Sequence, residues 1–455
     1  MINRRFVLLG LAGTAGIAQT RYALAASAAL QDAKMRGSLN AVEAGVLPGA
    51  FDAQSRVFQD MLNNASDKDL AIFLPAGDYV IGNIILPARV RLAGVKGATR
   101  LIFAGGDFLL ATKASEAIEL DGITIDGGSM PLMQDVQALL DIRNGAEVSI
   151  KNVEITGSSR HGLYLENCGG AVESCTISNA IEAGLYSVNA VALRIQGNII
   201  HTCSNGGIWV HRFEIGDDGT QVLNNRISGI ASTNGGTGQW GNGINVYQAN
   251  NVIIANNTLN NCAFSAIRAN SASNVQIVGN QCLKSGETGI YAEFKFEGAV
   301  INSNIVDGAA NGISVVNFNE GGRLATVQGN IVRNLKTEGP YPAEVAGFGY
   351  GIAIEADTTA TGNTIENAPK AAFLVGWGEF MRNIVITGNV VRNAATGVQI
   401  SVVEGTGKAV ITDNVFDDIK GSAIGGFRWA DQVTGDLANG GVIPKNMVIE
   451  RNASS

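Results

Sequence analysis

This 455-residue sequence lacks both a long hydrophobic run and an excess of basic residues. After the first 25 residues, no segment reaches the roughly 18 uninterrupted apolar residues that a membrane-spanning helix needs. We therefore expect no membrane insertion of the mature chain. Acidic residues outnumber basic ones by 40 to 32, which gives a net charge of −8 and argues against nucleic acid and anionic lipid as partners. A uniformly polyanionic glycan is also disfavoured, unless a local basic patch or a bridging cation intervenes.

Histidine and cysteine are scarce, at three and five residues, and no spacing typical of a metal site occurs. We therefore predict no cofactor, with a divalent cation left open. The odd number of cysteines does not suit a complete disulfide framework. Cys203 and Cys262 each follow a repeated asparagine by five residues, which indicates small positions facing the core. Cys168 and Cys175 flank one turn, so a disulfide between them is left open.

The first 25 residues have the features of an export signal. Arg4 and Arg5 lie in a segment that resembles the twin-arginine signature, a mildly apolar stretch follows, and Ala23-Leu24-Ala25 offers a cleavage site. The alternative is an ordinary secretory signal with an accidental arginine pair. The segment has three arginines and no acid, so its removal lowers the net charge from −8 to −11. We predict a periplasmic or secreted protein, exported by twin-arginine translocation.

One short pattern recurs along most of the chain: a β-branched run, an asparagine, a second apolar run, a loop and then Gly-Ile-x-Val. Where the copies are closest, at Asn257, Asn280 and Asn304, the asparagines lie 23 and 24 residues apart. Longer copies place their extra residues before the next Gly-Ile-x-Val. The repeated residues are Asn198, Asn225, Asn257, Asn280, Asn304, Asn330, Asn363, Asn389 and Asn414, with Asn152 and Asn452 at the two ends.

This period predicts a right-handed parallel β-helix. Three short strands with three turns fit about 23 residues, whereas a repeat of paired helices usually needs about 33. The 58 glycines also make long helices unfavourable. Equivalent residues of successive coils would stack about 4.8 Å apart, so the asparagines would form a ladder that satisfies buried turn groups. We expect an all-β solenoid of about eleven or twelve coils.

The N-terminal part of the chain predicts a cap for this solenoid. Residues 26–50 have little pattern and indicate a loosely packed lead-in. Apolar residues from Phe51 to Leu62 suit an amphipathic helix, which would cover the open end of the sheets. We therefore assign residues 1–25 to the signal peptide, 26–50 to the lead-in, 51–110 to the capping helix and first coils, and 111–455 to the β-helix repeats.

The segment from Leu70 to Tyr79 ends in Pro-Ala-Gly-Asp-Tyr and resembles the first coils of the pectate-lyase-like right-handed β-helix superfamily. With its leader, the chain also looks like a family of twin-arginine-translocated repeat proteins of unassigned function. The resemblance implies the fold and leaves the activity open. Polygalacturonase-like sites use Asn-Thr-Asp, Asp-Asp, Gly-His-Gly and Arg-Ile-Lys, but here Asp217-Asp218 lies in a loop and His161 follows Arg160. No aspartate cluster resembles the calcium site of pectate lyases.

Two columns of outward side chains are predicted on the Gly-Ile-x-Val strands, because side chains alternate along a strand. Good strand formers on an exposed sheet are the alternative interpretation of the aromatic residues, but these residues thin out after Tyr291. The x position gives Tyr164, Tyr186, Trp209, Asn245, Arg268, Tyr291, Ser314 and Ala353. The residue after Val gives Glu166, Val188, His211, Tyr247, Asn270, Glu293, Val316 and Glu355.

Long segments flank the same strands, at residues 212–219, 226–242 and 332–350. Loops on both sides of one sheet would form a groove. Aromatic rings beside carboxylates and amides suit sugars, because sugar rings have apolar faces and hydroxyl edges. We therefore predict one continuous exposed strip that binds polysaccharide, with the contact residues Tyr164, Tyr186, Trp209, Trp240, Asn245, Tyr291 and Glu355.

The candidate catalytic residues are Arg268, Glu293, Tyr247, His211 and Lys295. In a lyase or epimerase, an arginine would neutralise a uronate carboxylate while a tyrosine, histidine or lysine moves protons. Glycoside hydrolysis needs two carboxylates instead. The alternative is an exposed arginine–glutamate pair with no catalytic role. Two functions remain: a carbohydrate-active enzyme, whether lyase, epimerase or hydrolase, or a non-catalytic glycan-binding or envelope repeat protein.

Overall fold

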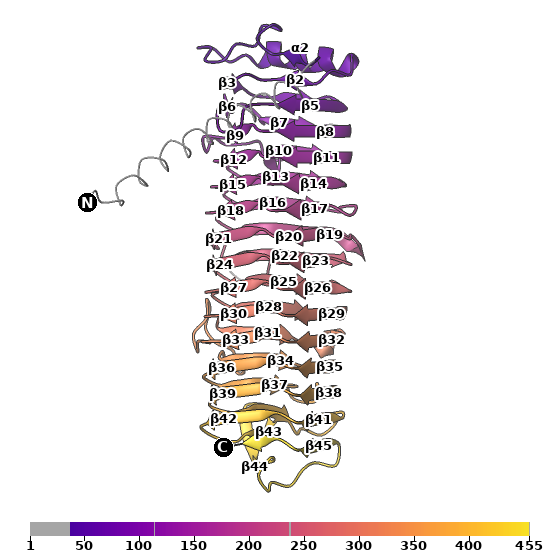
Figure 1. Ribbon diagram of the computed structural model, residues 1–455, viewed down its shortest axis with the longest axis vertical. Coiled ribbons are helices and arrows are strands. Elements are labelled where there is room, and N and C mark those ends of the chain that lie inside the picture. Colours follow the sequence, from indigo (N-terminus) through magenta and orange to yellow (C-terminus); the bar gives the residue numbers. More distant parts are fainter. Residues whose placement is uncertain (1–36, 113, 236–237, 455) are drawn as a thin grey trace, which may run out of the picture.

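The computed structural model describes residues 37–112, 114–235 and 238–454, and in it three parallel β-sheets wind into one column (Figure 1). The predicted signal peptide lies outside the described residues, as does the lead-in up to residue 36. Except at the two ends of the column, consecutive strands belong to different sheets, and each strand pairs with the strand three places further along the chain. The predicted all-β parallel solenoid is therefore confirmed.

Sheet 1 has 16 strands and begins at the N-terminal end. Its strands are β1 (Leu39–Asn40), β2 (Ile72–Phe73), β5 (Arg89–Ala93), β8 (Ser115–Asp121), β11 (Gly145–Lys151), β14 (Gly170–Glu173), β17 (Arg194–Gln196), β20 (Gln221–Leu223), β23 (Ile253–Ala255), β26 (Val275–Val278), β29 (Glu297–Asn302), β32 (Arg323–Gln328), β35 (Ala356–Thr361), β38 (Arg382–Thr387), β41 (Ala409–Thr412) and β45 (Met447–Glu450).

Sheet 2 has 15 strands and contains the Gly-Ile-x-Val segments. Its strands are β4 (Ile84–Leu86), β7 (Leu110–Thr112), β10 (Ala138–Arg143), β13 (His161–Glu166), β16 (Ala183–Val188), β19 (Gly206–Asp217), β22 (Asn242–Asn250), β25 (Ile267–Asn270), β28 (Thr288–Glu293), β31 (Asn311–Val315), β34 (Tyr350–Ile354), β37 (Ala371–Val375), β40 (Val398–Ser401), β43 (Ile424–Arg428) and β44 (Asp431–Asp436).

Sheet 3 also has 15 strands. They are β3 (Gly77–Ile81), β6 (Thr99–Phe103), β9 (Thr124–Asp126), β12 (Glu154–Thr156), β15 (Thr176–Ser178), β18 (Ile199–His201), β21 (Arg226–Ile230), β24 (Thr258–Cys262), β27 (Gln281–Leu283), β30 (Ile305–Asp307), β33 (Ile331–Arg333), β36 (Thr364–Ala368), β39 (Val390–Ala394), β42 (Val415–Ile419) and β46 (Ala453–Ser454). The column holds more coils than the eleven or twelve expected, because the N-terminal coils and the tail add strands to the same sheets.

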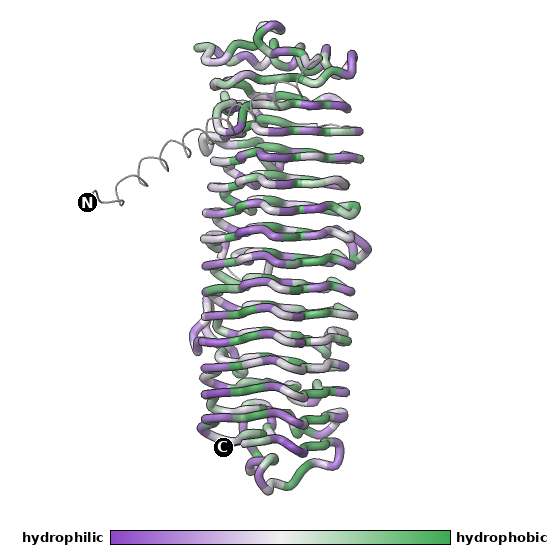
Figure 2. Tube along the Cα trace, in the orientation of Figure 1, coloured by the Kyte–Doolittle hydropathy of each residue, from purple (hydrophilic) through white to green (hydrophobic). Residues whose placement is uncertain are grey.

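The interior of the column is a continuous apolar core. Apolar and polar residues alternate along each coil, which Figure 2 shows as interleaved green and purple segments. The inward residues are mainly isoleucine, valine and leucine, and almost all are fully buried. This alternation is what a short strand with one buried face requires, and it explains why the period was readable in the sequence.

The asparagine ladder runs between sheets 1 and 3, where each coil turns. In each step the backbone N–H and the side-chain Nδ2 of one asparagine donate to the Oδ1 of the next, as from Asn280 to Asn304 at 2.9 and 3.0 Å. Nδ2 of Asn280 also donates to a backbone carbonyl of the preceding coil. The ladder continues to Asn452 at the C-terminal end. The prediction that Asn152 begins the ladder is wrong. Asn152 occupies the neighbouring turn position with a positive φ, and its amide donates to Asp121.

The N-terminal end is capped by the helix α2 (Ser55–Asp67), as predicted. The helix lies across the top of the column in Figure 1 and packs on β3, β4 and β5. Its buried residues include Phe58 and Met61, whereas Phe51 precedes the helix and is exposed, contrary to its assignment to the apolar face. The loosely packed lead-in is also wrong for residues 37–50, because β1 pairs with β2 and Ala41 is fully buried.

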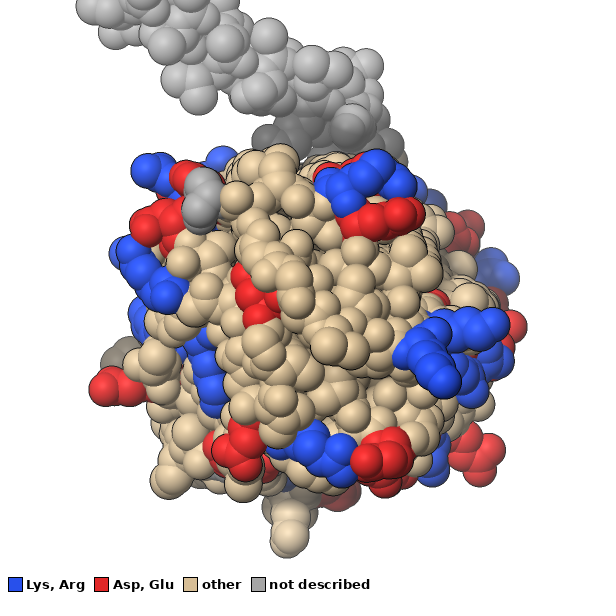
Figure 3. Space-filling view, turned by 90° about the horizontal axis from the view of Figure 1, so that it is seen from below, with Lys and Arg blue, Asp and Glu red and all other residues tan. Residues whose placement is uncertain are grey.

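The C-terminal end is closed by a different device. Strand β44 turns back and pairs antiparallel with β43, so the last parallel strand of sheet 2 is not left as an open edge. Figure 3 views this end, where uncharged residues cover most of the face and oppositely charged side chains lie beside each other around the rim.

No helix among the described residues is long and apolar enough to cross a membrane.

All five cysteines are free and buried. Cys203 and Cys262 face the core, as predicted. The possible disulfide is absent, because the Cys168 and Cys175 thiols each approach backbone carbonyls of their own turns instead. Burial raises the pKa of both thiols to about 11, so they remain protonated at neutral pH.

Candidate functional site

The two predicted columns are real and form an outer strip on sheet 2. The strand register places Tyr164, Tyr186 and Trp209 directly above one another, and Asn245, Arg268 and Tyr291 continue the same column. The second column contains His211, Tyr247, Asn270 and Glu293, each one coil further on. We call these two columns, from β10 to β34, the outer strip.

The predicted exposure of this strip is wrong for most of its members. Trp209 is only 5% exposed, and Tyr164, Asn245, Arg268, His211 and Glu293 are also buried. They lie outside the solenoid core but are covered by one another and by the loops that rise beside the sheet. Tyr247 is the most accessible of the rings in the strip, at 39% exposed. A candidate ligand would therefore meet pockets between covered patches rather than a continuous open surface.

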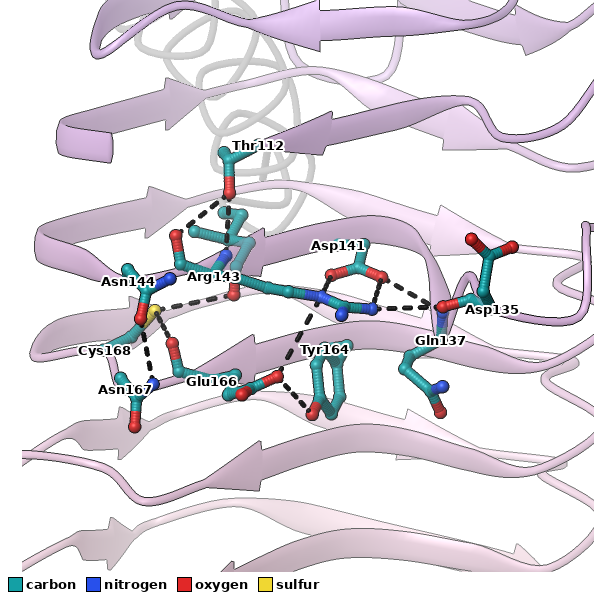
Figure 4. Close-up of polar contacts among 11 residues, drawn as sticks. Thr112, Asp135, Gln137, Asp141, Arg143, Asn144, Tyr164, Glu166, Asn167 and Cys168 are labelled. Carbon is teal, nitrogen blue, oxygen red and sulfur yellow. Dashed lines mark hydrogen bonds and ion pairs between the residues drawn. The ribbon is translucent and has the colours of Figure 1, made fainter. Parts of the chain in front are cut away.

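The N-terminal end of the strip is a closed polar network, drawn in Figure 4. Arg143 donates two hydrogen bonds of 2.8 Å to Asp141, which is buried one coil before Tyr164. The hydroxyl of Tyr164 donates to Glu166 at 2.9 Å, and the Arg143 guanidinium lies 5.3 Å from the centre of the Tyr164 ring. Burial and Glu166 raise the pKa of Tyr164. These groups satisfy one another and offer little free hydrogen-bonding capacity.

An aromatic cluster follows in the next coils. Tyr186 and Trp209 meet edge to face with ring centres 5.2 Å apart, and Trp209 stacks on His211 at 5.4 Å. His211 in turn contacts Tyr247, and His161 packs against both Tyr186 and Trp209. These contacts explain why the rings are buried: each fills the space above its neighbour instead of pointing to solvent.

His211 is held as a neutral imidazole. Burial lowers its pKa to about 3, and Nδ2 of Asn245 lies 3.2 Å from its Nε2. Because an amide nitrogen can only donate, Nε2 is the acceptor and the ring proton resides on Nδ1. A ring with this pKa does not carry an imidazolium proton at neutral pH. The same burial lowers the pKa of His161 to about 3.

Arg268 and Glu293 form a buried ion pair, as their placement in adjacent coils predicted. Nε of Arg268 donates to Glu293 Oε1 at 2.6 Å, and Asn270 donates to the same oxygen at 2.8 Å. Nη1 of Arg268 also donates to the carbonyl of Gly238, in the loop before β22. The attraction of Glu293 raises the pKa of Arg268 although burial lowers it. The exposed form of this pair, weighed as the alternative, is therefore excluded.

The first of two pockets on the outer strip opens beside the aromatic cluster. This aromatic pocket has a volume of about 280 Å³, and Tyr247, His211 and Arg268 are part of its wall. The remaining walls come from Tyr186, Trp209, Gly238, Gln239, Asn245 and Asn270. Its size and its mixture of rings and amides fit one or two sugar rings better than a flat protein surface would.

The second pocket lies further along the strip, under the loop that precedes β34. This Glu355 pocket has a volume of about 360 Å³. Its wall contains two carboxylates, Glu344 and Glu355, and six aromatic residues, which are Tyr291, Tyr341, Phe348, Tyr350, Trp377 and Phe380. Tyr291 belongs to β28, next to the buried ion pair, so the two pockets flank the Arg268–Glu293 pair on opposite sides along the strip.

Glu355 is partly buried at the end of β34. Its Oε2 accepts a hydrogen bond of 2.7 Å from the backbone N–H of Phe318. Burial raises the pKa of Glu355 to about 7, because removing a carboxylate from water disfavours its charged form. At neutral pH this group is therefore divided between its acid and carboxylate forms, which suits a group that transfers a proton.

Four predicted site residues lie outside both pocket walls, and two of them, Tyr164 and Glu293, are engaged in the polar network and the ion pair described above. Lys295 is exposed in the turn after β28, and Trp240 is half-buried in the loop before β22. Sequence reasoning missed Asp141, Glu287 and Trp377. The signal for Asp141 was present, because it precedes Tyr164 by one 23-residue period, but its strand has Leu139-Leu140 instead of Gly-Ile. Glu287 is buried and accepts from Ser265 and Tyr341, a contact that only the folded loop creates.

Within residues 37–112, 114–235 and 238–454, no three His, Cys, Asp or Glu side chains gather in a way that could hold a metal ion. The acidic residues of the strip are instead engaged by arginines, amides or backbone groups. The chemistry that these residues offer by themselves is proton transfer and hydrogen bonding.

The architecture and strip define a right-handed parallel β-helix protein. The family model described as "Right handed beta helix region" matches residues 138–214 and 213–383, more than half of the chain. The chain belongs to this family, which confirms the predicted handedness and the wider superfamily resemblance. A search of curated proteins found no match to the sequence.

Solved structures with the same architecture come from different biological settings. The N-terminal fragment of bacteriophage Phi29 gene product 12 has 14% identity and a TM-score of 0.51, with 89% of this chain and 66% of that chain covered. The catalytic unit of a Streptomyces thermodiastaticus α-1,3-glucanase has 16% identity and a TM-score of 0.48, with 92% of this chain and 69% of that chain covered. An Azotobacter vinelandii mannuronan C-5 epimerase A-module has 14% identity and a TM-score of 0.47, with 91% of this chain and 100% of that chain covered. Likeness at this level concerns the fold alone.

Proposed function

We propose that the chain binds a polysaccharide along the outer strip and cleaves or modifies it there. The observation that carries this proposal is the pair of pockets on one sheet face, lined by aromatic rings and polar side chains. Sugar rings stack on aromatic faces, while their hydroxyls need amide and carboxylate partners. Successive coils are about 4.8 Å apart, so pockets on neighbouring coils suit a long, repetitive ligand.

A non-catalytic glycan-binding protein is the second candidate, and one observation favours it. The predicted catalytic pair Arg268 and Glu293 is buried and internally satisfied, so neither side chain is free to meet a substrate at that point. Catalysis would therefore have to use other groups of the strip. The aromatic pocket is adequate for binding alone.

Replacing Tyr247 with Ala is expected to weaken polysaccharide binding about 3- to 10-fold without unfolding the protein. Stacking of an aromatic ring contributes about 0.5–1.5 kcal/mol beyond area burial, and Tyr247 is the accessible ring of the aromatic pocket. Trp209 is less suitable for this test because it is buried in the cluster. Affinity would be measured by isothermal titration calorimetry with the best ligand from a panel of glycans.

Phe213 provides the matched control. It lies on the same strand β19, is 64% exposed, and is not part of the wall of the aromatic pocket. Phe213→Ala should leave the affinity unchanged. Equal losses in both variants would place the binding surface elsewhere and contradict the proposal for the strip.

We further propose that the protein is exported through the twin-arginine route, from the residues of its leader. This route carries folded proteins, which suits a chain whose free cysteines require no oxidative pairing. Replacing Arg4 and Arg5 together with Lys should leave the precursor in the cytoplasm, as followed by fractionation and immunoblotting. Unchanged export would favour the ordinary secretory signal.

A further inference from the structure

The Glu355 pocket differs from the rest of the strip in its charges. Its wall contains Glu344 and Glu355 but no lysine or arginine. Two basic residues lie beside the wall without being part of it. Lys370 donates to the Ala346 carbonyl and lies over the Tyr350 ring, and Arg382 pairs with Asp357 and lies over the Phe318 ring. The pocket is thus an acidic and aromatic space.

Glu355 also differs from the other carboxylates of the strip. Asp141 is paired with Arg143 and Glu293 with Arg268, so each of these carboxyl groups has a cation as its partner. Among the described residues, no lysine or arginine forms an ion pair with Glu355, which accepts a hydrogen bond from the backbone N–H of Phe318. A carboxyl group without a cation, in a partly buried pocket, is one that can hold and release a proton.

The absence of a cation from the wall of this pocket bears on the substrate. Elimination or C5 epimerisation of a uronate passes through an enolate-like state that requires a positive group or metal at the substrate carboxylate. Two carboxylates facing one pocket would repel the carboxylate of a uronate substrate. Hydrolysis of a glycosidic bond needs the opposite equipment, an acid and a base carboxylate on either side of the bond.

We propose that Glu355 is the proton donor and Glu344 the proton acceptor in the hydrolysis of a glycosidic bond in a neutral polysaccharide. Glu355 gives its proton to the glycosidic oxygen as the bond from the anomeric carbon to that oxygen breaks. A water molecule attacks the anomeric carbon and loses its proton to the Glu344 carboxylate. The products are one new reducing end and one new hydroxyl, and solvent restores both carboxyl groups.

The surroundings of the two residues fit these roles. Glu344 is exposed on the loop between β33 and β34, where water can reach it, whereas Glu355 lies against the sheet. Tyr291, Tyr350 and Trp377 surround the space between the sheet and this loop and would hold the sugar rings. The raised pKa of Glu355 means that a substantial fraction carries its proton at pH 7. Turnover should accordingly decline as the pH rises above about 7.

The test compares Glu355→Gln and Glu344→Gln with the control Glu338→Gln. Glu338 is exposed on the same loop but is not part of the pocket wall. A glutamine at 355 retains an oxygen that can accept from Phe318, and the exposed position 344 tolerates substitution, so both variants should fold. Reducing ends released from neutral glycans, unsaturated uronate absorbance from acidic ones, and binding affinity are measured for each protein.

Both pocket variants are expected to lose turnover by about 100-fold or more while binding changes less than about threefold, and Glu338→Gln should match the parent. A ¹³C NMR titration of the glutamate carboxyls should lose a signal titrating near pH 7 in Glu355→Gln alone. Undiminished turnover in Glu355→Gln, or unsaturated uronate products, would overturn this assignment while leaving polysaccharide action intact. Binding of a neutral glycan with no turnover by the parent protein would overturn it as well. Absence of binding to every glycan would overturn the proposed function on which it rests.

Discussion

Replacing Arg268 with Ala should lower the free energy of unfolding by about 3–5 kcal/mol. The substitution leaves the carboxylate of Glu293 buried without its cation, and it also removes the hydrogen bond that holds the Gly238 carbonyl. An unpaired buried charge is costly because water cannot replace the lost partner. Urea unfolding followed by circular dichroism would measure the change.

Arg333 is the matched control for this prediction. It pairs with Asp307 at 2.9 Å, but its side chain is 48% exposed, so Arg333→Ala should cost less than about 1 kcal/mol. The double variant Arg268→Met/Glu293→Leu should recover much of the loss, because two apolar side chains replace the pair without leaving a charge. Equal effects of Arg268→Ala and Arg333→Ala would show that the strip pair is more hydrated than the structure indicates.

Replacing Asn280 with Ala should cost about 3 kcal/mol or more, because each ladder asparagine serves two neighbours. Its Oδ1 accepts from the backbone N–H and the Nδ2 of Asn257, and its Nδ2 donates to Ile254 and Asn304. Removal leaves several fully buried polar groups without partners, at about 1–3 kcal/mol for each. The same urea titration measures this loss.

Asn260 is the matched control, because it is an asparagine near the ladder that does not belong to it. It lies on β24 with its side chain exposed, so Asn260→Ala should change stability by less than about 0.5 kcal/mol. A small effect at Asn280 would mean that water or a shifted coil replaces the ladder hydrogen bonds. Such a result would remove the physical basis for the recurrence of asparagine at this turn of successive coils.

The fold could be predicted from the sequence because each coil of a solenoid repeats the same pattern of turn and core residues. The ladder asparagines fix the turn of each coil, and the inward positions of every strand are apolar, so one repeat predicts the next. The prediction of a loosely packed lead-in failed because residues 37–50 do not carry this repeated pattern. Ala41 and Val46 lie in a segment without pattern, yet both are buried under the cap. Their burial depends on tertiary contacts that cannot be recognised from a repeated sequence pattern.

The site could be predicted only in part. Period-two alternation placed Trp209, Arg268 and Glu293 correctly on the outer face, but it does not determine exposure. Loops and neighbouring rings cover these residues, and their arrangement depends on the fold of segments that carry no repeat. The wall of the Glu355 pocket could not be predicted for the same reason. Tyr341 and Glu344 reach it from the loop before β34, and Trp377 follows β37, beyond the last strand of the two predicted columns.

The most direct measurement for the account is a crystal structure of the Glu355→Gln variant with an oligosaccharide that it binds. We predict sugar rings on the outer strip, one against Tyr247 and one between Tyr291 and Trp377, with a glycosidic oxygen facing residue 355. An oligosaccharide bound on sheet 1 or sheet 3, with both pockets empty, would contradict the account.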